Sequence, residues 1–211
     1  MNSSTTKMWE ISEVIPPIDV KTFFGSKPPK LWSVGDPALL NHPLLGIISA
    51  RQVDSELAAK TSQLLKQLVS LKDVAFVSGW HSPLEEEALR ILLAHEAIIV
   101  LCVAKSLDRF TPSMGVESRV TDGKALVLTH CSTKAKRITR NASLRRNELI
   151  VELAKILLVL SAPEGSASLN LARAAMRRGK LVVTPDHPMN KELLASGALP
   201  ATLDNLQPAL R

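Results

Sequence analysis

The sequence predicts an α/β protein with a doubly wound, mainly parallel Rossmann-like sheet that carries helices on both faces. Six short aliphatic runs are spaced along the chain, most of them are followed by a segment with helical periodicity, and 45% of the 211 residues are hydrophobic. Apolar runs without alternation are typical of parallel strands that are buried on both faces. Alternation of such strands with helices is typical of α/β domains.

The elements follow in order from this pattern. Strands are predicted at residues 45–50, 74–77, 97–103, 125–129, 156–160 and 181–183. Helices are predicted at residues 54–71, 83–95, 149–155, 166–178 and 190–196. The first helix has the clearest signal, because Leu57, Leu64, Leu65, Leu68 and Leu71 recur at helical spacing. The stretch after residue 103 has no regular periodicity.

The prolines, the hydropathy pattern and the cysteines indicate the domain boundaries and the cellular location. Prolines 16, 17, 28 and 29 oppose a continuous helix, so we expect an extended N-terminal arm over residues 1–30 and one Rossmann-like domain over residues 31–205. No run approaches the roughly 18 apolar residues of a membrane span, and the polar start does not resemble a secretory signal. Cys102 and Cys131 make neither a disulfide framework nor a metal quartet. We therefore expect a cytoplasmic protein with no membrane association, no metal and no cofactor.

One short segment carries the whole charge imbalance. The chain has 26 Lys plus Arg against 20 Asp plus Glu, a formal net charge of +6. Residues 131–147 contain no carboxylate, so the rest of the chain is neutral in sum. The cations of this segment are Lys134, Lys136, Arg137, Arg140, Arg145 and Arg146. Such a cluster attracts polyanions, although a solubilising loop is the alternative interpretation.

The predicted topology indicates where a ligand binds. Ligands of open parallel sheets bind beyond the carboxyl ends of the strands, where helix N-termini offer free amides. A guanidinium after a strand can bind phosphate, a glycine permits close approach of the backbone, and serines at a helix start donate to anions. The residues predicted to contact phosphate are Arg51, Ser78, Gly79, Lys134, Lys136, Arg137, Arg140, Arg145, Arg146, Asn147, Ser166 and Ser168.

Plainer alternatives stand beside two of these predictions. Arg51 could instead be a solvated side chain that pairs with Asp54. Trp80, beside Gly79, could stack on a base or could pack in the core. The glutamates at residues 85–87 form an acidic patch that the dipole of the following helix explains without chemistry.

No catalytic constellation is present in the sequence. There is no G-x-S-x-G elbow, no cysteine with an obvious histidine partner and no tyrosine. The loop at residues 161–168 is neither G-x-G-x-x-G nor a Walker loop. We therefore expect a binding protein that is not an enzyme.

An ordered series of segments carries a family resemblance. PPKLWSVG at residues 28–35 resembles a P-P-x-L-y-x-x-G entry, GIISAR at 46–51 a strand ending in V-G-S-R, and VSG at 77–79 the start of S-G-x-A-x-G-I-D. RN at 146–147 resembles R-N-R-I-I, SASL at 166–169 resembles S-G-S-L, and residues 179–185 and 193–198 resemble the closing G-R-x-x-x-x-P and L-I-x-x-G-A. Over residues 28–200 the chain thus resembles the DNA-processing protein A family (DprA, also called Smf). It departs from the family at residues 80–85, at Glu148, at Ala167 and at Leu171.

The resemblance implies a Rossmann core that binds single-stranded DNA, a homodimer, and a RecA-like recombinase as partner. The leading hypothesis is therefore a non-catalytic protein that binds the phosphate backbone of single-stranded DNA in DNA processing and recombination. The alternative is a sensor that binds a nucleotide at the same edge of the sheet. A nucleotide phosphoribohydrolase is the least favoured hypothesis, because loop 161–168 lacks the glycines and the downstream glutamate of P-G-G-x-G-T-x-x-E.

Overall fold

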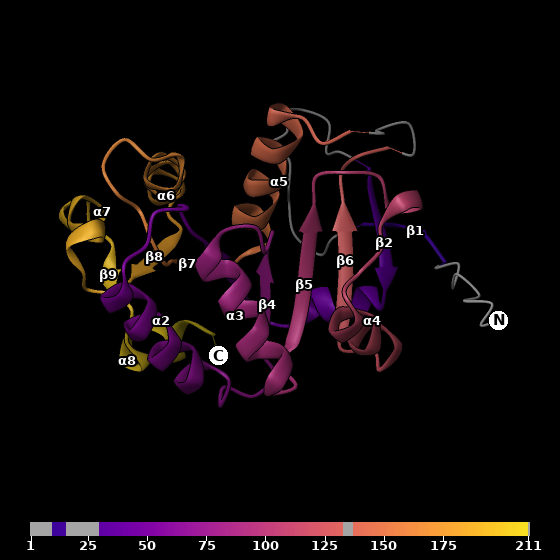
Figure 1. Cartoon of the computed structure of the whole chain (residues 1–211), viewed down its shortest axis with the longest axis horizontal. Helices are drawn as coiled ribbons and strands as arrows, with labels where there is room; N and C mark the ends of the chain where they lie inside the picture. The colour runs from indigo at the N-terminus through magenta and orange to yellow at the C-terminus, as the bar shows by residue number, and fades with distance from the viewer. Residues whose placement is uncertain (1–9, 16–29, 133–136, 211) are drawn as a thin grey trace.

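The structure, a computed structural model, describes residues 10–15, 30–132 and 137–210. They form one nine-stranded sheet with the order β1-β2-β6-β5-β4-β3-β7-β8-β9 (Figure 1). The parallel strands are β3 (Leu44–Ile48), β4 (Ala75–Ser78), β5 (Ile98–Val103), β6 (Ala125–Thr129), β7 (Ile156–Val159), β8 (Leu181–Thr184) and β9 (Leu199–Pro200). At one end, β1 (Ser12–Val14) and β2 (Leu31–Gly35) extend the sheet in antiparallel pairing.

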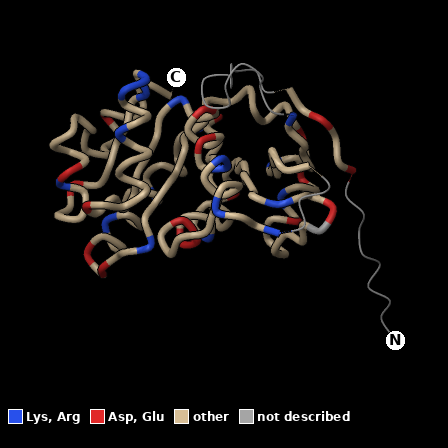
Figure 2. The backbone as a smooth tube through the Cα atoms, turned by 90° about the horizontal axis from the view of Figure 1, so that it is seen from above, with Lys and Arg blue, Asp and Glu red and all other residues tan. Residues whose placement is uncertain are grey.

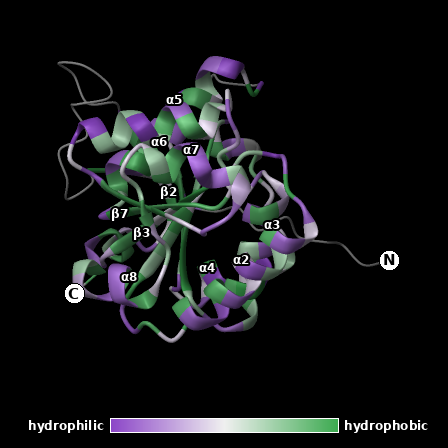
Figure 3. Ribbon diagram, turned by 90° about the vertical axis from the view of Figure 1, so that its left-hand side faces the viewer, coloured by the Kyte–Doolittle hydropathy of each residue, from purple (hydrophilic) through white to green (hydrophobic). Residues whose placement is uncertain are grey.

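Helices cover both faces of this sheet (Figure 3). One hydrophobic cluster joins the sheet to α2 (Ser55–Leu68), α3 (Pro83–Ala94), α4 (Met114–Thr121) and α8 (Leu203–Leu210). The other joins it to η1 (Pro37–Asn41), α5 (Arg140–Leu153), α6 (Ala167–Arg177) and α7 (Lys191–Ala195). Two short 3₁₀ turns, η2 (Leu107–Arg109) and η3 (Pro188–Asn190), follow β5 and β8. None of the described helices is both long and apolar enough to cross a membrane.

Local sequence explains where the helices near the carboxyl ends of the strands begin. Asp54 caps α2 by accepting a hydrogen bond from Leu57 N at 2.8 Å, and Thr139 caps α5 in the same way through Ala142 N. Ser82 and Glu85 form a capping box at the start of α3. Ser166 caps α6 through Leu169 N. Each cap satisfies an amide that would otherwise lack a partner at the helix start.

The chain reverses direction across the sheet between β3 and β7. From β3 the strands proceed one way to β6, whereas β7, β8 and β9 proceed the other way. The loops that follow the two central strands are joined, because Ala50 N donates to Ser161 O at 2.8 Å and Ser161 Oγ donates to Gln52 O at 2.7 Å. The carboxyl ends of β3 to β6 therefore lie on one side of this point and those of β7 to β9 on the other.

The predicted fold class is confirmed, and each of the six predicted strands is present. One prediction about the basic segment was wrong, because α5 begins at Arg140 rather than at residue 149. The second half of the predicted basic loop is therefore a helix. The irregular stretch after β5 forms η2 and α4. Within the predicted N-terminal arm, residues 12–14 belong to the sheet as β1, and at the other end α8 continues to Leu210.

Candidate functional site

Cationic side chains gather where β3, β4, β5 and β6 end. Arg51 follows β3, Lys105 follows β5, and Arg145 and Arg146 lie on α5, whose N-terminus is at the same edge (Figure 1). Figure 2 views the molecule from this edge and shows Lys and Arg positions near the middle of the view. We call Arg51, Lys105, Arg145 and Arg146 the basic cluster.

Arg146 is the buried member of the basic cluster, with 6% of its surface exposed. Its Nη1 donates to Cys102 O at 3.4 Å, and its Nε donates to the side-chain oxygen of Asn147 at 2.7 Å. The guanidinium lies directly on the backbone of Gly79, where a β-carbon would overlap it. Three predicted site residues, Gly79, Arg146 and Asn147, are thus in one place, and Asn147 holds the arginine there.

Glu85 links the loops that follow β3 and β4. Its Oε1 accepts a hydrogen bond from Ser49 N at 2.8 Å, and its Oε2 accepts from His81 N at 2.8 Å and from Ser82 N at 3.3 Å. Burial raises the pKa of this carboxyl above its ordinary value, and the amide of His81, nearby Arg146 and the amides of Ser82 and Ser49 offset part of that rise. Both loops at the floor of the site are therefore held by one buried carboxylate.

Two histidines report the local positive potential. The pKa of His81 lies below its ordinary value because of burial and, after that, because of Arg146, Arg51 and Lys105. Burial, together with Arg145 and Arg146, lowers the pKa of His130 to about 4. Both imidazoles are consequently neutral at pH 7. Arg146 acts on both imidazoles, Arg51 and Lys105 act on His81, and Arg145 acts on His130, so cations that follow β3 and β5 or lie on α5 make this part of the edge favourable for an anion.

The loop after β4 explains the roles of Ser78 and Trp80. Ser78 is fully buried, and its hydroxyl accepts a hydrogen bond from Trp80 N at 3.3 Å. Trp80 is 6% exposed and belongs to the hydrophobic cluster that also includes residues of α3 and η2. It packs in the core instead of presenting a face on which a base could stack. Its φ of 54° is in the left-handed region, an uncommon conformation for a residue with a side chain.

The remaining predicted residues lie on either side of the basic cluster. Arg137 and Arg140 are exposed at the start of α5, and Lys134 and Lys136 lie outside the described residues. Arg51 is exposed and, in the described part of the chain, makes no ion pair with Asp54. Asp54 instead caps α2 and faces His187. The alternative interpretation of Arg51 is thus right about its solvent exposure and wrong about its pairing with Asp54.

The other half of the carboxyl edge is acidic. A hollow of about 600 Å³ lies beyond β3, β7 and β8. Its lining includes Asp54, Glu56, Glu164 and Glu192 beside Lys191 and the buried His187. His187 Nδ1 accepts a hydrogen bond from Met189 N, so Nε2 carries the proton and faces Asp54 Oδ1 at 3.3 Å.

The loop at residues 161–168 borders this acidic hollow rather than the basic cluster. Pro163 and Glu164 line the hollow. Ser166 uses its hydroxyl to cap α6, and Ser168 lies in the first turn of that helix. Two of the nearby carboxylates are ion-paired, Glu56 with Lys60 and Glu192 with Arg173. Together with Asp54 and Glu164 they still make the surroundings of Ser166 and Ser168 less favourable for an anion than those of Arg146.

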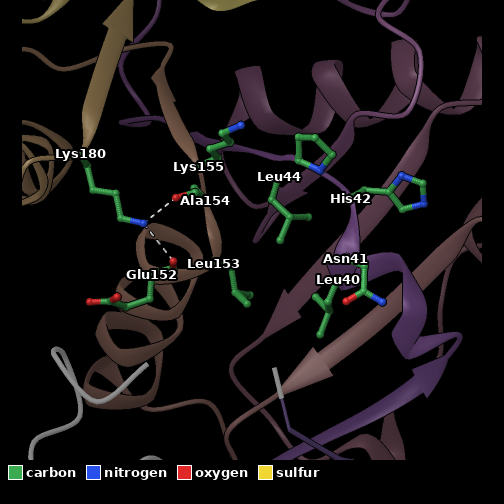
Figure 4. Close-up of a pocket in the computed structure, with 10 residues that line it drawn as sticks. Leu40, Asn41, His42, Leu44, Glu152, Leu153, Ala154, Lys155 and Lys180 are labelled. Atoms are coloured by element: carbon green, nitrogen blue, oxygen red, sulfur yellow. Dashed lines mark hydrogen bonds between the residues drawn. The ribbon is translucent and has the colours of Figure 1, made fainter. Parts of the chain in front are cut away.

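A second hollow of about 400 Å³ lies at the opposite edge, where β3, β7 and β8 begin (Figure 4). Lys180 projects between the loops there and donates to Ala154 O at 2.6 Å and to Glu152 O at 3.0 Å. Both carbonyls are at the C-terminal end of α5. Lys180 thus caps the C-terminal end of α5, which is a structural role.

Two residues of the site did not stand out in the sequence. Lys105 follows β5 in a stretch without periodicity, although its place after a strand is a usable signal. Glu85 has the pattern of an ordinary helix-start glutamate, and only the adjacency of β3 and β4 shows its contact with Ser49. Among the described residues, no group of His, Cys, Asp and Glu is placed to hold a metal ion.

Comparisons with known proteins place this geometry in context. The model of a protein family described as DNA recombination-mediator protein A matches residues 13–201. A search of the curated proteins gave no match.

Solved structures share the fold. DNA processing protein A from Streptococcus pneumoniae superimposes with a TM-score of 0.77 at 19% identity, covering 96% of this chain and 74% of the other. The Helicobacter pylori protein, described as having a unique single-stranded DNA binding mode, gives 0.76 at 22% identity, covering 96% and 94%. A molybdenum cofactor binding protein from Rippkaea orientalis gives 0.55 at 17% identity, covering 79% and 94%.

Proposed function

The chain belongs to the DNA recombination-mediator protein A family, and from this premise we propose that it binds the phosphate backbone of single-stranded DNA at the basic cluster. The observation that carries the proposal is the convergence of Arg51, Lys105, Arg145 and Arg146 at the carboxyl ends of neighbouring parallel strands. Cations in this arrangement neutralise successive phosphates of a strand without regard to its sequence.

The exposure of these side chains fits contact with a polymer. Arg51 and Arg145 are exposed, Lys105 is half-buried, and Arg137 and Arg140 continue the positive charge along the start of α5. Trp80 is buried, so the protein lacks an aromatic face for bases at this loop. Contact with the phosphate backbone of the DNA is therefore better supported than stacking of its bases on aromatic side chains.

The protein acts by binding rather than by catalysis. The buried groups of the site are engaged with the backbone, as Glu85 is with three amides and Arg146 is with Cys102 O. The thiol of Cys102 is fully buried, and burial raises its pKa to about 12, so it is a poor nucleophile at neutral pH. A homodimer, a RecA-like recombinase partner and a cytoplasmic location remain part of the proposal.

A nucleotide-sensing function has weaker support. Its best structural support is the likeness to molybdenum cofactor binding proteins, at a TM-score of 0.55 against 0.77 and 0.76 for the DNA processing proteins. The serine-rich loop that would receive a terminal phosphate in such a sensor borders carboxylates instead. We therefore favour single-stranded DNA over a single nucleotide as the ligand.

Salt dependence tests the proposal directly. Fluorescence polarisation with a labelled oligo-dT should show binding at low salt. If four phosphates are neutralised, affinity should fall roughly 50-fold between 50 and 200 mM salt. A labelled duplex of the same length serves as the comparison ligand. Absence of any affinity for oligo-dT at low salt would refute the proposal.

A further inference from the structure

The carboxylate of Glu85 accepts hydrogen bonds from three backbone amides of two loops. Ser49 N belongs to the loop after β3, whereas His81 N and Ser82 N belong to the loop after β4. A capping box accounts only for the bond to Ser82 N, which is the longest of the three at 3.3 Å. The two bonds of 2.8 Å lie outside that motif and bring a second loop into the arrangement.

These amides have the arrangement of a phosphate site. Phosphate groups bind where several backbone N–H groups converge near a helix N-terminus and a guanidinium is close by. Here the amides converge beside α3, and the buried guanidinium of Arg146 lies on Gly79 of the same loop. Glu85 is 7% exposed and Arg146 is 6% exposed, so both charges are inside the protein. The place of an external anion is taken by a side chain.

We propose that Glu85 is a built-in anion that fills the deep end of the phosphate site and makes the protein select a chain of phosphates over a single phosphate. This inference rests on the proposed function. With the deep amides occupied, an external phosphate meets the exposed cations Arg51 and Arg145 and the half-buried Lys105, which come from different elements. One phosphate reaches one of them and gains little, because isolated contacts with exposed cations are weak. Several linked phosphates reach all of them together.

Removal of the side chain should open the deep site to a small anion. In Glu85→Ala, three amides lose their hydrogen-bond acceptor and Arg146 loses a nearby carboxylate, so the variant should melt below the wild type. Sodium phosphate or sodium formate should restore part of that loss, relative to sodium chloride at equal ionic strength. At a phosphate concentration about ten times the dissociation constant, we expect a gain of roughly 3–5 °C in Tm. The matched control is Glu86→Ala, which changes an exposed neighbour on α3.

The wild type and Glu86→Ala should show a smaller response to phosphate than Glu85→Ala. An equal response in all three proteins would overturn the inference. If Glu85→Ala does not fold, Glu85→Ser also shortens the side chain and vacates the amides, and its gain in phosphate must exceed that of the wild type. Oligo-dT binding by the wild type is measured in parallel. If the wild type does not bind oligo-dT, the proposed function is contradicted. If the Tm of Glu85→Ala does not rise in phosphate, only the role of Glu85 is contradicted.

Discussion

The guanidinium of Arg146 occupies the space that a side chain at Gly79 would need. The two residues are 67 positions apart, and they meet because α5 packs over the end of β4. Glycine is required at position 79 by this close approach, since no positive φ is found there. The loop after β4 and the arginine of α5 therefore form one unit.

Gly79→Ala should disturb this unit. The added methyl group meets a guanidinium that is fixed by Cys102 O and Asn147, so we expect a loss of about 1–3 kcal/mol in the free energy of unfolding. Urea denaturation measures the loss. Gly115→Ala is the control, because a β-carbon there meets only the side chain of Leu93. Equal stability of the two variants would show that Arg146 moves aside freely.

Arg51→Ala should weaken binding of single-stranded DNA without unfolding the protein. Arg51 is exposed after β3, and its loss removes one of the proposed phosphate contacts. We expect a fall in affinity on the order of 5-fold and a salt slope smaller by about 0.7. Fluorescence polarisation at several salt concentrations measures both. Arg177→Ala, an exposed arginine at the far end of α6, should leave affinity and slope unchanged.

The protein should become less stable as the pH is lowered, and His130 should account for part of this loss. Its pKa is lowered from 6.5 to about 4, so between these values the unfolded chain binds the proton and the folded protein does not. Stability is therefore unaffected by this group above pH 6.5 and decreases as pH falls toward 4. His130→Gln removes the titrating group. Thermal melts from pH 7 to pH 4 should show a shallower decline for the variant, and parallel curves would contradict the prediction.

Lys180→Met should destabilise the fold and leave DNA binding intact. The substitution removes two hydrogen bonds to the carbonyls that end α5, and we expect a loss of about 1–2 kcal/mol. Urea denaturation gives the stability, and oligo-dT titration gives the affinity. Lys124→Met, at an exposed turn before β6, is the control. A selective loss of DNA affinity in Lys180→Met would contradict the structural role of Lys180.

The sequence was most informative about the strands and the fold class. The six runs are recognisable because their strands are buried almost throughout, and polar residues such as Ser78 and Thr129 stand only at the strand ends. The start of α5 was missed for the opposite reason. Its first turns expose Arg140, Leu144 and Arg145 to solvent, and its buried side begins only at Arg146. Thr139 is a helix cap, but a threonine alone is a weak signal of one.

The candidate site could be predicted only in part, because its remaining features depend on which strands are neighbours. The cations after strands are visible in the sequence, whereas the contact of Glu85 with Ser49 depends on the pairing of β3 with β4. The placement of Ser166 and Ser168 depends on the reversal between β3 and β7. This reversal puts their loop, which contains Glu164, beside Asp54 of the loop that follows β3. The charge around a loop therefore depends on which other loops the fold brings to the same edge of the sheet.

The division of the carboxyl edge into a basic and an acidic half limits the length of contact. The basic half covers β3, β4, β5 and β6, which are separated by three inter-strand spacings. At about 4.8 Å for each spacing, that length is roughly 14 Å. Toward β7, a bound strand meets the carboxylates around His187. If single-stranded DNA binds at the basic cluster as proposed, one molecule holds only a short stretch of it, and the strand leaves the surface before it reaches β7.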